Sequence, residues 1–395
     1  MDLSLSEDLL AFQHEVRTWL DEHMVGEFAA SAGVGGPADD IGWDVRLAWD
    51  RELVAGGWLC LGWPREYGGR GASVDEQLIF QLECARANPP SRATNSGQDL
   101  FGPTLLAFGS DAIKRRFLPR IADATEFWGQ GFSEPGAGSD LAGLRTRAVR
   151  DGDDWVLDGQ KIWMSGGARA HWLYVLCRTD PAASRHHGLS LLLIRADAPG
   201  VDIRPIRNMT GGAEFCEVFF TGARTPADLV VGEVGDGWRV AMGALGTERG
   251  TTLLAEQLRI VAEVDDLVVL ARERGLTGDK QVHRRLAEAW SAAQVMRWNG
   301  LRLMTTIKTD PAAATTQASV SKVFASGAHQ AIGELAMALR GPDSELLAPD
   351  GTLDAQQQMF LATRAESIYG GTTQVQLNIL AERALGMPRE PRPAR

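Results

Sequence analysis

Residues 131–140 carry the clearest chemical signal in the chain and read G-F-S-E-P-G-A-G-S-D. Residues this small let a backbone lie close to a flat, polar ligand, and Ser133 and Ser139 add two hydroxyls. Gly136 and Gly138 can adopt a positive φ, so they permit a sharp bend with exposed N–H groups. The stretch predicts a cradle for a cofactor, although a simple surface turn has the same composition.

A second motif, D-G-Q-K-I-W-M-S, occupies residues 158–165. Asp158 and Gly159 predict a tight hairpin turn, which places Trp163 on the strand that follows. Side chains two positions apart on a strand share a face, so Trp163 and Ser165 are expected to project together. An indole beside a hydroxyl can stack on an isoalloxazine ring and hydrogen-bond its N5 edge. The simpler alternative is a tryptophan in a hairpin core.

The elements that must position these residues change character along the chain. Helices are expected over residues 7–20, 42–60, 74–87 and 100–118, the last ending near Pro119. Short β-favouring runs follow at residues 155–157, 172–177, 189–194 and 215–220. Long helical patterns return beyond Gly237. We therefore predict an α+β fold with a helical N-terminal domain (1–124), a small antiparallel β domain (125–235) and a C-terminal helix bundle (236–395).

Composition narrows the class of protein. A chain of 395 residues with 44% hydrophobic residues can build two or three domains. A net charge of -11 argues against a nucleic-acid partner or an anionic membrane surface. No apolar run reaches the roughly 18 to 20 residues of a membrane span, and the first ten residues are too acidic for a signal peptide. We expect a cytoplasmic enzyme with no metal site, because neither the histidines nor the cysteines have metal-ligand spacing. The four cysteines are expected to be free thiols, mostly buried: Cys60, Cys84, Cys177 and Cys216.

Three motifs together resemble the acyl-CoA dehydrogenases: S-E-P-G-A-G-S-D, G-Q-K-I-W-M-S and the C-terminal I-Y-G-G-T-T-Q-V-Q. Residues 62–69, G-W-P-R-E-Y-G-G, are similar to a turn between helices of that family, so the resemblance covers nearly the whole chain. It implies an FAD-dependent oxidoreductase of lipid metabolism. The implied reaction converts an acyl-CoA thioester to the 2-enoyl-CoA: a base removes a proton from Cα while a hydride leaves Cβ for flavin N5.

The resemblance also implies which residues meet FAD. The backbone of Phe132 and Ser133 would lie at the pyrimidine edge, and Trp163 and Ser165 would lie against the ring and N5. The residues implied at the pyrophosphate are Ser139, Thr372 and Gln374. Glu134 and Asp140 are expected to fix the loop through hydrogen bonds rather than to do chemistry.

At the adenosine end of FAD the match weakens. Arg274 corresponds to an arginine that reaches the FAD of a neighbouring subunit, but Thr277 replaces the aromatic residue of that motif. A further Q-x-x-G-G segment of the family is matched at most in part by residues 340–341, which read R-G. A solvated arginine at a helix end is the alternative for Arg274.

The catalytic base stands at an unusual position. Many family members carry a glutamate where this chain has Gly370, and glycine cannot accept a proton. The family has an alternative position on the first long C-terminal helix, which Glu248 occupies here. Burial in an apolar pocket would raise the pKa of Glu248 and make it a better base. The alternative is that Glu248 has no catalytic role and lies in a first helical turn, where the helix dipole stabilises a negative charge. Glu366 is a weaker candidate, one helical turn before Gly370.

Two further residues are assigned to the substrate. Arg249 is expected to position the thioester or, alternatively, the C-terminal loop, and Tyr369 is expected to line the acyl pocket or, alternatively, to pack in the core. The arrangement resembles enzymes for branched, long or steroid-derived acyl groups. The resemblance implies electron-transfer flavoprotein as electron acceptor and a homo- or hetero-oligomer, either a dimer or a tetramer. Two alternatives keep the fold: a non-catalytic subunit that completes a partner's FAD site, and a flavin oxidase or monooxygenase.

Overall fold

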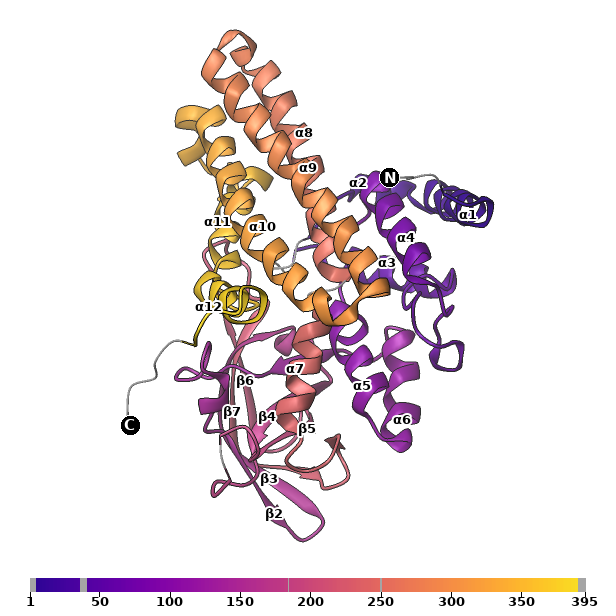
Figure 1. Cartoon of the computed structure of the whole chain (residues 1–395), viewed down its shortest axis with the longest axis vertical. Coiled ribbons are helices and arrows are strands. Elements are labelled where there is room, and N and C mark those ends of the chain that lie inside the picture. The colour runs from indigo at the N-terminus through magenta and orange to yellow at the C-terminus, as the bar shows by residue number, and fades with distance from the viewer. Residues whose placement is uncertain (1–4, 36–40, 184, 249–250, 390–395) are drawn as a thin grey trace. The chain divides into compact units, whose positions relative to one another are not determined.

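The computed structural model describes residues 5–35, 41–183, 185–248 and 251–389 (Figure 1). Only the backbone is described for residues 247, 248, 251–256, 311 and 312. The chain forms two compact units, Met1–Glu248 and Arg249–Arg395. The first contains the N-terminal helices, the sheet and one helix after the sheet. In the described part of the second unit, every regular element is a helix.

The first unit begins with helices, as expected from the sequence. The expected helices 7–20 and 74–87 are confirmed, and Ser73 caps the second in a capping box with Glu76. The expected helix 42–60 ends early, at Ala55. The expected single helix 100–118 is wrong, because Ser110 starts a new helix that runs through Pro119. The helices are α1 (Glu7–His23), α2 (Gly26–Ala30), α3 (Trp43–Ala55), α4 (Val74–Ala87), α5 (Gly102–Phe108) and α6 (Asp111–Ala122).

The β segment folds into one eight-stranded sheet in the order β6-β7-β3-β2-β4-β5-β8, with β1 paired to β4. Most pairs are antiparallel, but β1 and β2 each run parallel to β4. All four β-favouring runs lie in strands. The strands are β1 (Trp128–Gly131), β2 (Arg147–Asp151), β3 (Asp154–Ser165), β4 (Trp172–Arg178), β5 (Leu189–Arg195), β6 (Val201–Ile206), β7 (Phe215–Pro226) and β8 (Val230–Val231).

The expected hairpin turn at Asp158 and Gly159 is wrong. Strand β3 continues through both residues, and the register against β7 shifts there instead. The tight turn lies earlier, between β2 and β3, where Gly152 has a φ of 60°. A Cβ on Gly159 would come within 2.6 Å of Thr146, so this glycine allows the segment just before β2 to pass close to the strand.

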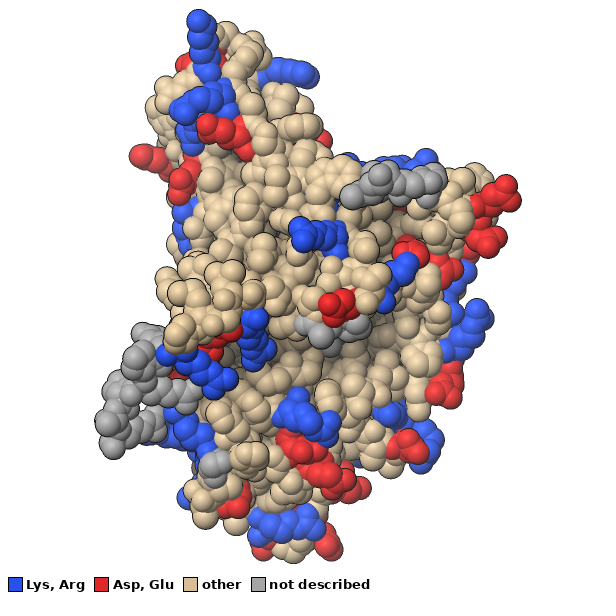
Figure 2. All heavy atoms as spheres, in the orientation of Figure 1, with Lys and Arg blue, Asp and Glu red and all other residues tan. Residues whose placement is uncertain are grey.

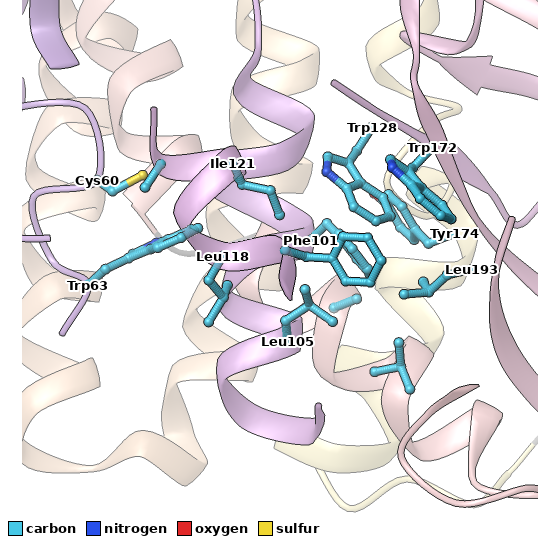
Figure 3. Packing of buried hydrophobic residues seen from close by; sticks show 14 of the residues in the cluster. Cys60, Trp63, Phe101, Leu105, Leu118, Ile121, Trp128, Trp172, Tyr174 and Leu193 are labelled. Carbon is cyan, nitrogen blue, oxygen red and sulfur yellow. The ribbon is translucent and has the colours of Figure 1, made fainter. Parts of the chain in front are cut away.

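Aromatic packing joins the sheet to the helices of the first unit. Phe101 is fully buried and stacks on Tyr174 of β4, with ring centroids 4.5 Å apart. Trp128 of β1 lies 4.2 Å from the same phenyl ring, and Phe117 of α6 meets Trp128 edge-on. Figure 3 shows this aromatic core between the strands and α6. The packing anchors the start of β1, the strand that leads into the glycine-rich loop.

Helix α7 (Gly237–Glu248) follows the sheet and buries Val240 and Ala241 in the same core. The second unit then contains α8 (Thr251–Glu273), α9 (Lys280–Thr309), α10 (Pro311–Arg340), α11 (Ala355–Glu366) and α12 (Thr373–Ile379). Its core is formed mainly by α8, α9 and α10, where residues such as Leu267, Met296 and Ala336 are buried.

No helix among the described residues combines the length and apolarity needed to cross a bilayer. On the face drawn in Figure 2, basic and acidic side chains alternate among neutral ones.

Candidate functional site

The glycine-rich loop after β1 bends at a β-turn in which Glu134 and Ala137 exchange two backbone hydrogen bonds of 3.0 Å. Gly136 and Gly138 border open space, because a Cβ built on either would meet no atom within 4 Å. Neither glycine has a positive φ, so the loop bends without using the left-handed conformation that these glycines permit. What the two glycines provide is room for a flat group to approach the backbone.

A buried ion pair holds this loop against β3. The side chain of Lys161 is fully buried, and its Nζ lies 2.9 Å from Glu134 Oε1 and 2.9 Å from the carbonyl oxygen of Phe132. Glu134 also accepts hydrogen bonds from the backbone N–H groups of Arg145 and Thr146. Burial works to raise the pKa of Glu134, but the Lys161 charge and these hydrogen bonds hold it below its ordinary value. Glu134 therefore fixes the loop, as expected.

Trp163 faces outward from β3. Its side chain is 56% exposed, whereas the neighbouring Met164 is fully buried. Its φ of 58° is unusual for an aromatic residue and coincides with a register shift between Lys161 and Met164. Such strain costs on the order of 1–3 kcal/mol and persists where the surrounding structure imposes it, often at functional sites. The edge of Phe215 supports the indole, with ring centroids 6.1 Å apart.

The predicted flavin residues of the first unit lie close to one another. The backbone N–H of Ile162 donates to the carbonyl oxygen of Ser133 at 3.0 Å, which brings the loop beside the strand that carries Trp163. Phe132 is 5% exposed and packs edge-on against Tyr174. Contacts with β3 and with Tyr174 thus hold the backbone of the loop, while the indole of Trp163 remains exposed to solvent.

Three hydroxyls predicted to meet FAD belong to Ser133, Ser139 and Ser165. Ser139 is exposed and the other two are partly buried. Among the described residues, none of the three side chains forms a hydrogen bond. Asp140, next to Ser139, is held by an ion pair with Arg185. These hydroxyls can therefore donate to a ligand without breaking an existing contact.

In the second unit, the loop between α11 and α12 carries the other predicted residues. Gly370 and Gly371 have φ values of 62° and 90°, a conformation that favours glycine over a glutamate at this point. Tyr369 is 41% exposed. The carbonyl oxygen of Gly370 accepts from the buried side chain of Gln376 at 2.9 Å. The position that lacks the family's glutamate, Gly370, thus lies in a turn whose backbone conformation favours glycine.

Thr372 caps α12, because its hydroxyl oxygen accepts from the backbone N–H of Val375 at 3.2 Å. Its O–H remains available as a donor. Gln374 is exposed in the first turn of that helix.

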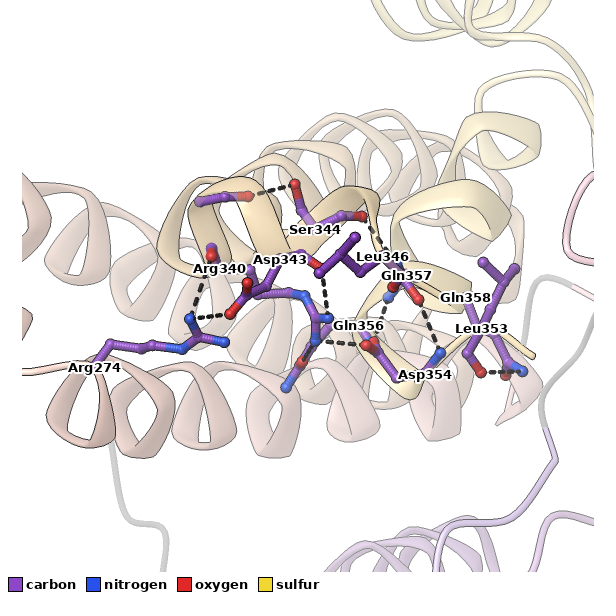
Figure 4. Close-up of polar contacts among 11 residues, drawn as sticks. Arg274, Arg340, Asp343, Ser344, Leu346, Leu353, Asp354, Gln356, Gln357 and Gln358 are labelled. Carbon is purple, nitrogen blue, oxygen red and sulfur yellow. Dashed lines mark hydrogen bonds and ion pairs between the residues drawn. The ribbon is translucent and has the colours of Figure 1, made fainter. Parts of the chain in front are cut away.

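Arg274 directly follows α8 and already has a partner (Figure 4). Its Nη1 is 2.6 Å from Asp343 Oδ2 and 3.5 Å from the carbonyl oxygen of Arg340. Arg340 in turn pairs with Asp354 at 2.5 Å. A phosphate at Arg274 would have to share this arginine with Asp343, so the structure fits FAD less well here than at the glycine-rich loop.

The proposed base lies at the edge of the described region. Glu248 is the last residue of α7 and its side chain is outside the described residues, as is all of Arg249. Glu366, the weaker candidate, is engaged: its Oε1 lies 2.7 Å from His329 Nδ1.

Sequence reasoning missed Lys161, Lys322 and His329, whose buried polar side chains organise both loops. A signal existed for Lys161, since it stands in a strand at a position that alternation assigns to the interior. His329 likewise stands among alanines and aliphatic residues on α10. Their partners lie far away in the sequence and could not be named from it.

Family models match nearly the whole chain. They are the N-terminal domain of acyl-CoA dehydrogenase over residues 6–125, the middle domain over residues 129–223 and the C-terminal domain over residues 235–385.

Similar proteins match nearly the whole length of the chain. The chain is 48% identical over 386 residues to acyl-CoA dehydrogenase IpdE1 of Mycobacterium tuberculosis, covering 97% of this chain and 99% of the relative. It is 45% identical over 390 residues to IpdE1 of Mycolicibacterium smegmatis, covering 96% and 98%. Among solved structures, it is 31% identical to the "Tcur3481-Tcur3483 steroid ACAD", with a TM-score of 0.86 over 99% of this chain and all of the other. It is also 31% identical to a chain of the ChsE4-ChsE5 complex of Mycobacterium tuberculosis, with a TM-score of 0.80 and coverage of 99% and 100%. This chain belongs to the acyl-CoA dehydrogenase family.

Proposed function

We propose that this acyl-CoA dehydrogenase binds FAD and converts a bulky, steroid-derived acyl-CoA thioester to its 2-enoyl-CoA, with Glu248 as the base. The observation that carries the proposal is the open glycine-lined loop beside the outward-facing Trp163. FAD, when bound, supplies the acceptor for the hydride that leaves the substrate Cβ.

The residues of the first unit fit the isoalloxazine end of this cofactor. Trp163 offers an indole face for stacking, and Ser165 offers a hydroxyl on the same strand. The backbone of Phe132 and Ser133 provides the polar edge, and Ser139 offers a donor to a phosphate oxygen. In the second unit, Thr372 and Gln374 would meet the pyrophosphate.

The choice of base follows from what the other candidates do. Gly370 has no side chain, and Glu366 is hydrogen-bonded to His329. Glu248, at the end of α7, is the remaining carboxylate at a position that the family uses, and we assign it the Cα proton. Arg249 would position the thioester, and Tyr369 would line the acyl pocket.

The substrate class rests on relatives and on the turn at Gly370. A 31%-identical solved structure is named a steroid acyl-CoA dehydrogenase. Glycine at residue 370 also leaves room that a glutamate side chain would fill. Both features favour a wide, fused-ring acyl group over a straight chain.

The assembly is part of the proposal. The solved relatives at 31% identity are named as pairs of different chains. We therefore propose that this chain works in a dimer or tetramer, made with itself or with a second related chain. In the cytoplasm, an electron-transfer flavoprotein would reoxidise the cofactor.

An anaerobic titration with a panel of straight, branched and steroid-derived acyl-CoA thioesters tests the proposal. Wild-type protein should bleach its flavin absorbance with the steroid-derived thioesters. Glu248→Gln should keep its flavin and lose at least about 100-fold in the reduction rate, which is the scale of general-base catalysis. Glu273→Gln is the matched control, since Glu273 is exposed on α8.

A Glu248→Gln variant that reduces its flavin at the wild-type rate would remove Glu248 as the base. Formation of hydrogen peroxide in air, with product, would favour an oxidase.

One observation favours a second candidate, a subunit that completes a partner's FAD site without turnover. Arg274 is already paired with Asp343, which weakens its fit to a phosphate. This candidate predicts that the purified chain gains flavin absorbance only with a partner chain and that Glu248→Gln changes nothing.

A further inference from the structure

Three titratable side chains meet inside the second unit. His329 of α10 is 5% exposed at its side chain, and its two ring nitrogens face two carboxylates. Nε2 lies 2.7 Å from Glu263 Oε2 on α8, and Nδ1 lies 2.7 Å from Glu366 Oε1 at the end of α11. The histidine therefore links three helices.

The geometry favours the imidazolium form beside two ionised carboxylates. A neutral ring has one nitrogen lone pair, which would face a carboxylate oxygen at 2.7 Å, whereas an imidazolium donates from both nitrogens. Burial works to lower the pKa of His329, but the hydrogen bonds and charges of Glu263 and Glu366 raise it to about 9. No group of three or more His, Cys, Asp or Glu in the described part of the chain could hold a metal ion, so this cluster is a hydrogen-bonded one.

A second buried cation lies two helical turns earlier on α10, on the same face. Lys322 is 9% exposed, and its Nζ donates to the carbonyl oxygens of Glu366 at 2.7 Å and Gly371 at 2.8 Å. Lys322 thus bridges the two ends of the loop between α11 and α12. His329 holds the side chain at one of those ends.

Neighbouring amides complete the anchoring of the loop. Gln330 donates to the carbonyl oxygen of Thr363 at 3.0 Å and to the hydroxyl of Ser367 at 3.2 Å. Against this fixed backbone, the apolar side chains of Ile368 and Tyr369 remain 65% and 41% exposed. A loop held at its ends by two buried cations thus presents two apolar side chains outward.

We propose that Lys322 and His329 are positioning residues that hold the loop 366–372 so that Tyr369 meets the acyl group in one orientation. The inference rests on the proposed function for the identity of that ligand. A purely structural need could be met by apolar side chains, because a buried ion pair seldom adds stability over a well-packed hydrophobic replacement. The two cations instead fix the orientation of the loop, because charge-assisted hydrogen bonds are directional. Lys322 binds the carbonyl oxygens of Glu366 and Gly371, and His329 binds the carboxylate of Glu366.

The experiment compares Lys322→Gln, Lys322→Arg and His329→Gln with a matched control, Gln357→Met. Gln357 is equally buried and also donates two hydrogen bonds to backbone carbonyls, but at the opposite end of α11. Lys322→Gln and His329→Gln should raise KM and lower kcat/KM for the acyl-CoA by about tenfold to a hundredfold, the scale of a misplaced binding group. Lys322→Arg should recover most of the loss because it keeps the charge. Gln357→Met should lose stability without this change in KM.

Amide hydrogen exchange of residues 366–376 gives a readout that does not depend on turnover. Exchange in this peptide should rise in Lys322→Gln and His329→Gln and remain at the wild-type level in Gln357→Met. If His329→Gln does not fold, Glu366→Gln tests the same link because it removes the charge and keeps the shape.

Equal effects on KM and on exchange in the Lys322, His329 and Gln357 variants would overturn the inference, because the network would then be only structural. A wild-type protein that no acyl-CoA reduces would instead refute the proposed function. The exchange measurement alone would then decide whether the two cations hold the loop.

Discussion

Removing the buried cation under the glycine-rich loop should be among the most damaging single changes in the first unit. Lys161→Met leaves Glu134 at 8% side-chain exposure without its partner. Breaking a buried pair in this way costs about 3–5 kcal/mol. Two backbone N–H groups still reach the carboxylate, at 2.6 and 2.8 Å, which puts the expected loss of unfolding free energy near the lower end, about 3 kcal/mol.

The double variant Lys161→Met with Glu134→Gln separates the charge from the hydrogen bonds. It removes the unpaired charge but turns one amide N–H₂ toward a backbone donor, which costs about 1–3 kcal/mol. We therefore expect the double variant to be no less stable than Lys161→Met alone. The surface pair Arg204–Asp202 is the control, since both side chains are more than half exposed and Arg204→Met should cost less than about 1 kcal/mol.

Urea unfolding followed by tryptophan fluorescence measures these differences, and visible absorbance after gel filtration measures the retained flavin. Lys161→Met should also lose flavin, because Lys161 holds the carbonyl oxygen of Phe132. A loss of unfolding free energy no larger than that of Arg204→Met would refute the assignment of this pair as the anchor of the loop.

Two further outcomes follow from the structure. Because the folded pKa of His329 is about 9 and its ordinary value is 6.5, its contribution to stability is complete below about pH 6.5 and is lost as pH rises through 9. Urea midpoints between pH 7 and 10 should therefore fall more steeply in wild type than in His329→Gln; equal slopes would contradict the charged state. Gly136→Ala should leave the urea midpoint unchanged, since the added methyl meets no atom within 4 Å, but should weaken flavin retention by occupying the open side of the loop; unchanged retention would place the cofactor elsewhere. The charged groups that contact His329 are Glu263 of α8 and Glu366 of α11. Arg259 pairs with Glu263 at 3.7 Å, and Lys322 donates to the backbone carbonyl oxygen of Glu366.

Local patterns predicted the elements well where the signal was short-range. The helices at residues 7–20 and 74–87 and all four β-favouring runs are confirmed, because capping residues and apolar periodicity act within a few positions. The hairpin at Asp158 failed for a long-range reason. Gly159 passes close to Thr146 on a neighbouring segment, and that packing overrides the turn preference of an Asp-Gly pair.

Amino-acid order alone was enough to identify the family, the order of its helical and β segments and the loop chemistry at residues 131–140, because each of these depends on residues close together in the chain. The folded molecule alone revealed which polar groups are buried and what they hold. Lys161 meets Glu134 across 27 positions, and His329 meets Glu366 across 37 and Glu263 across 66. A charge can be buried only where a partner of opposite charge is brought to it, and that meeting depends on how distant helices and strands pack.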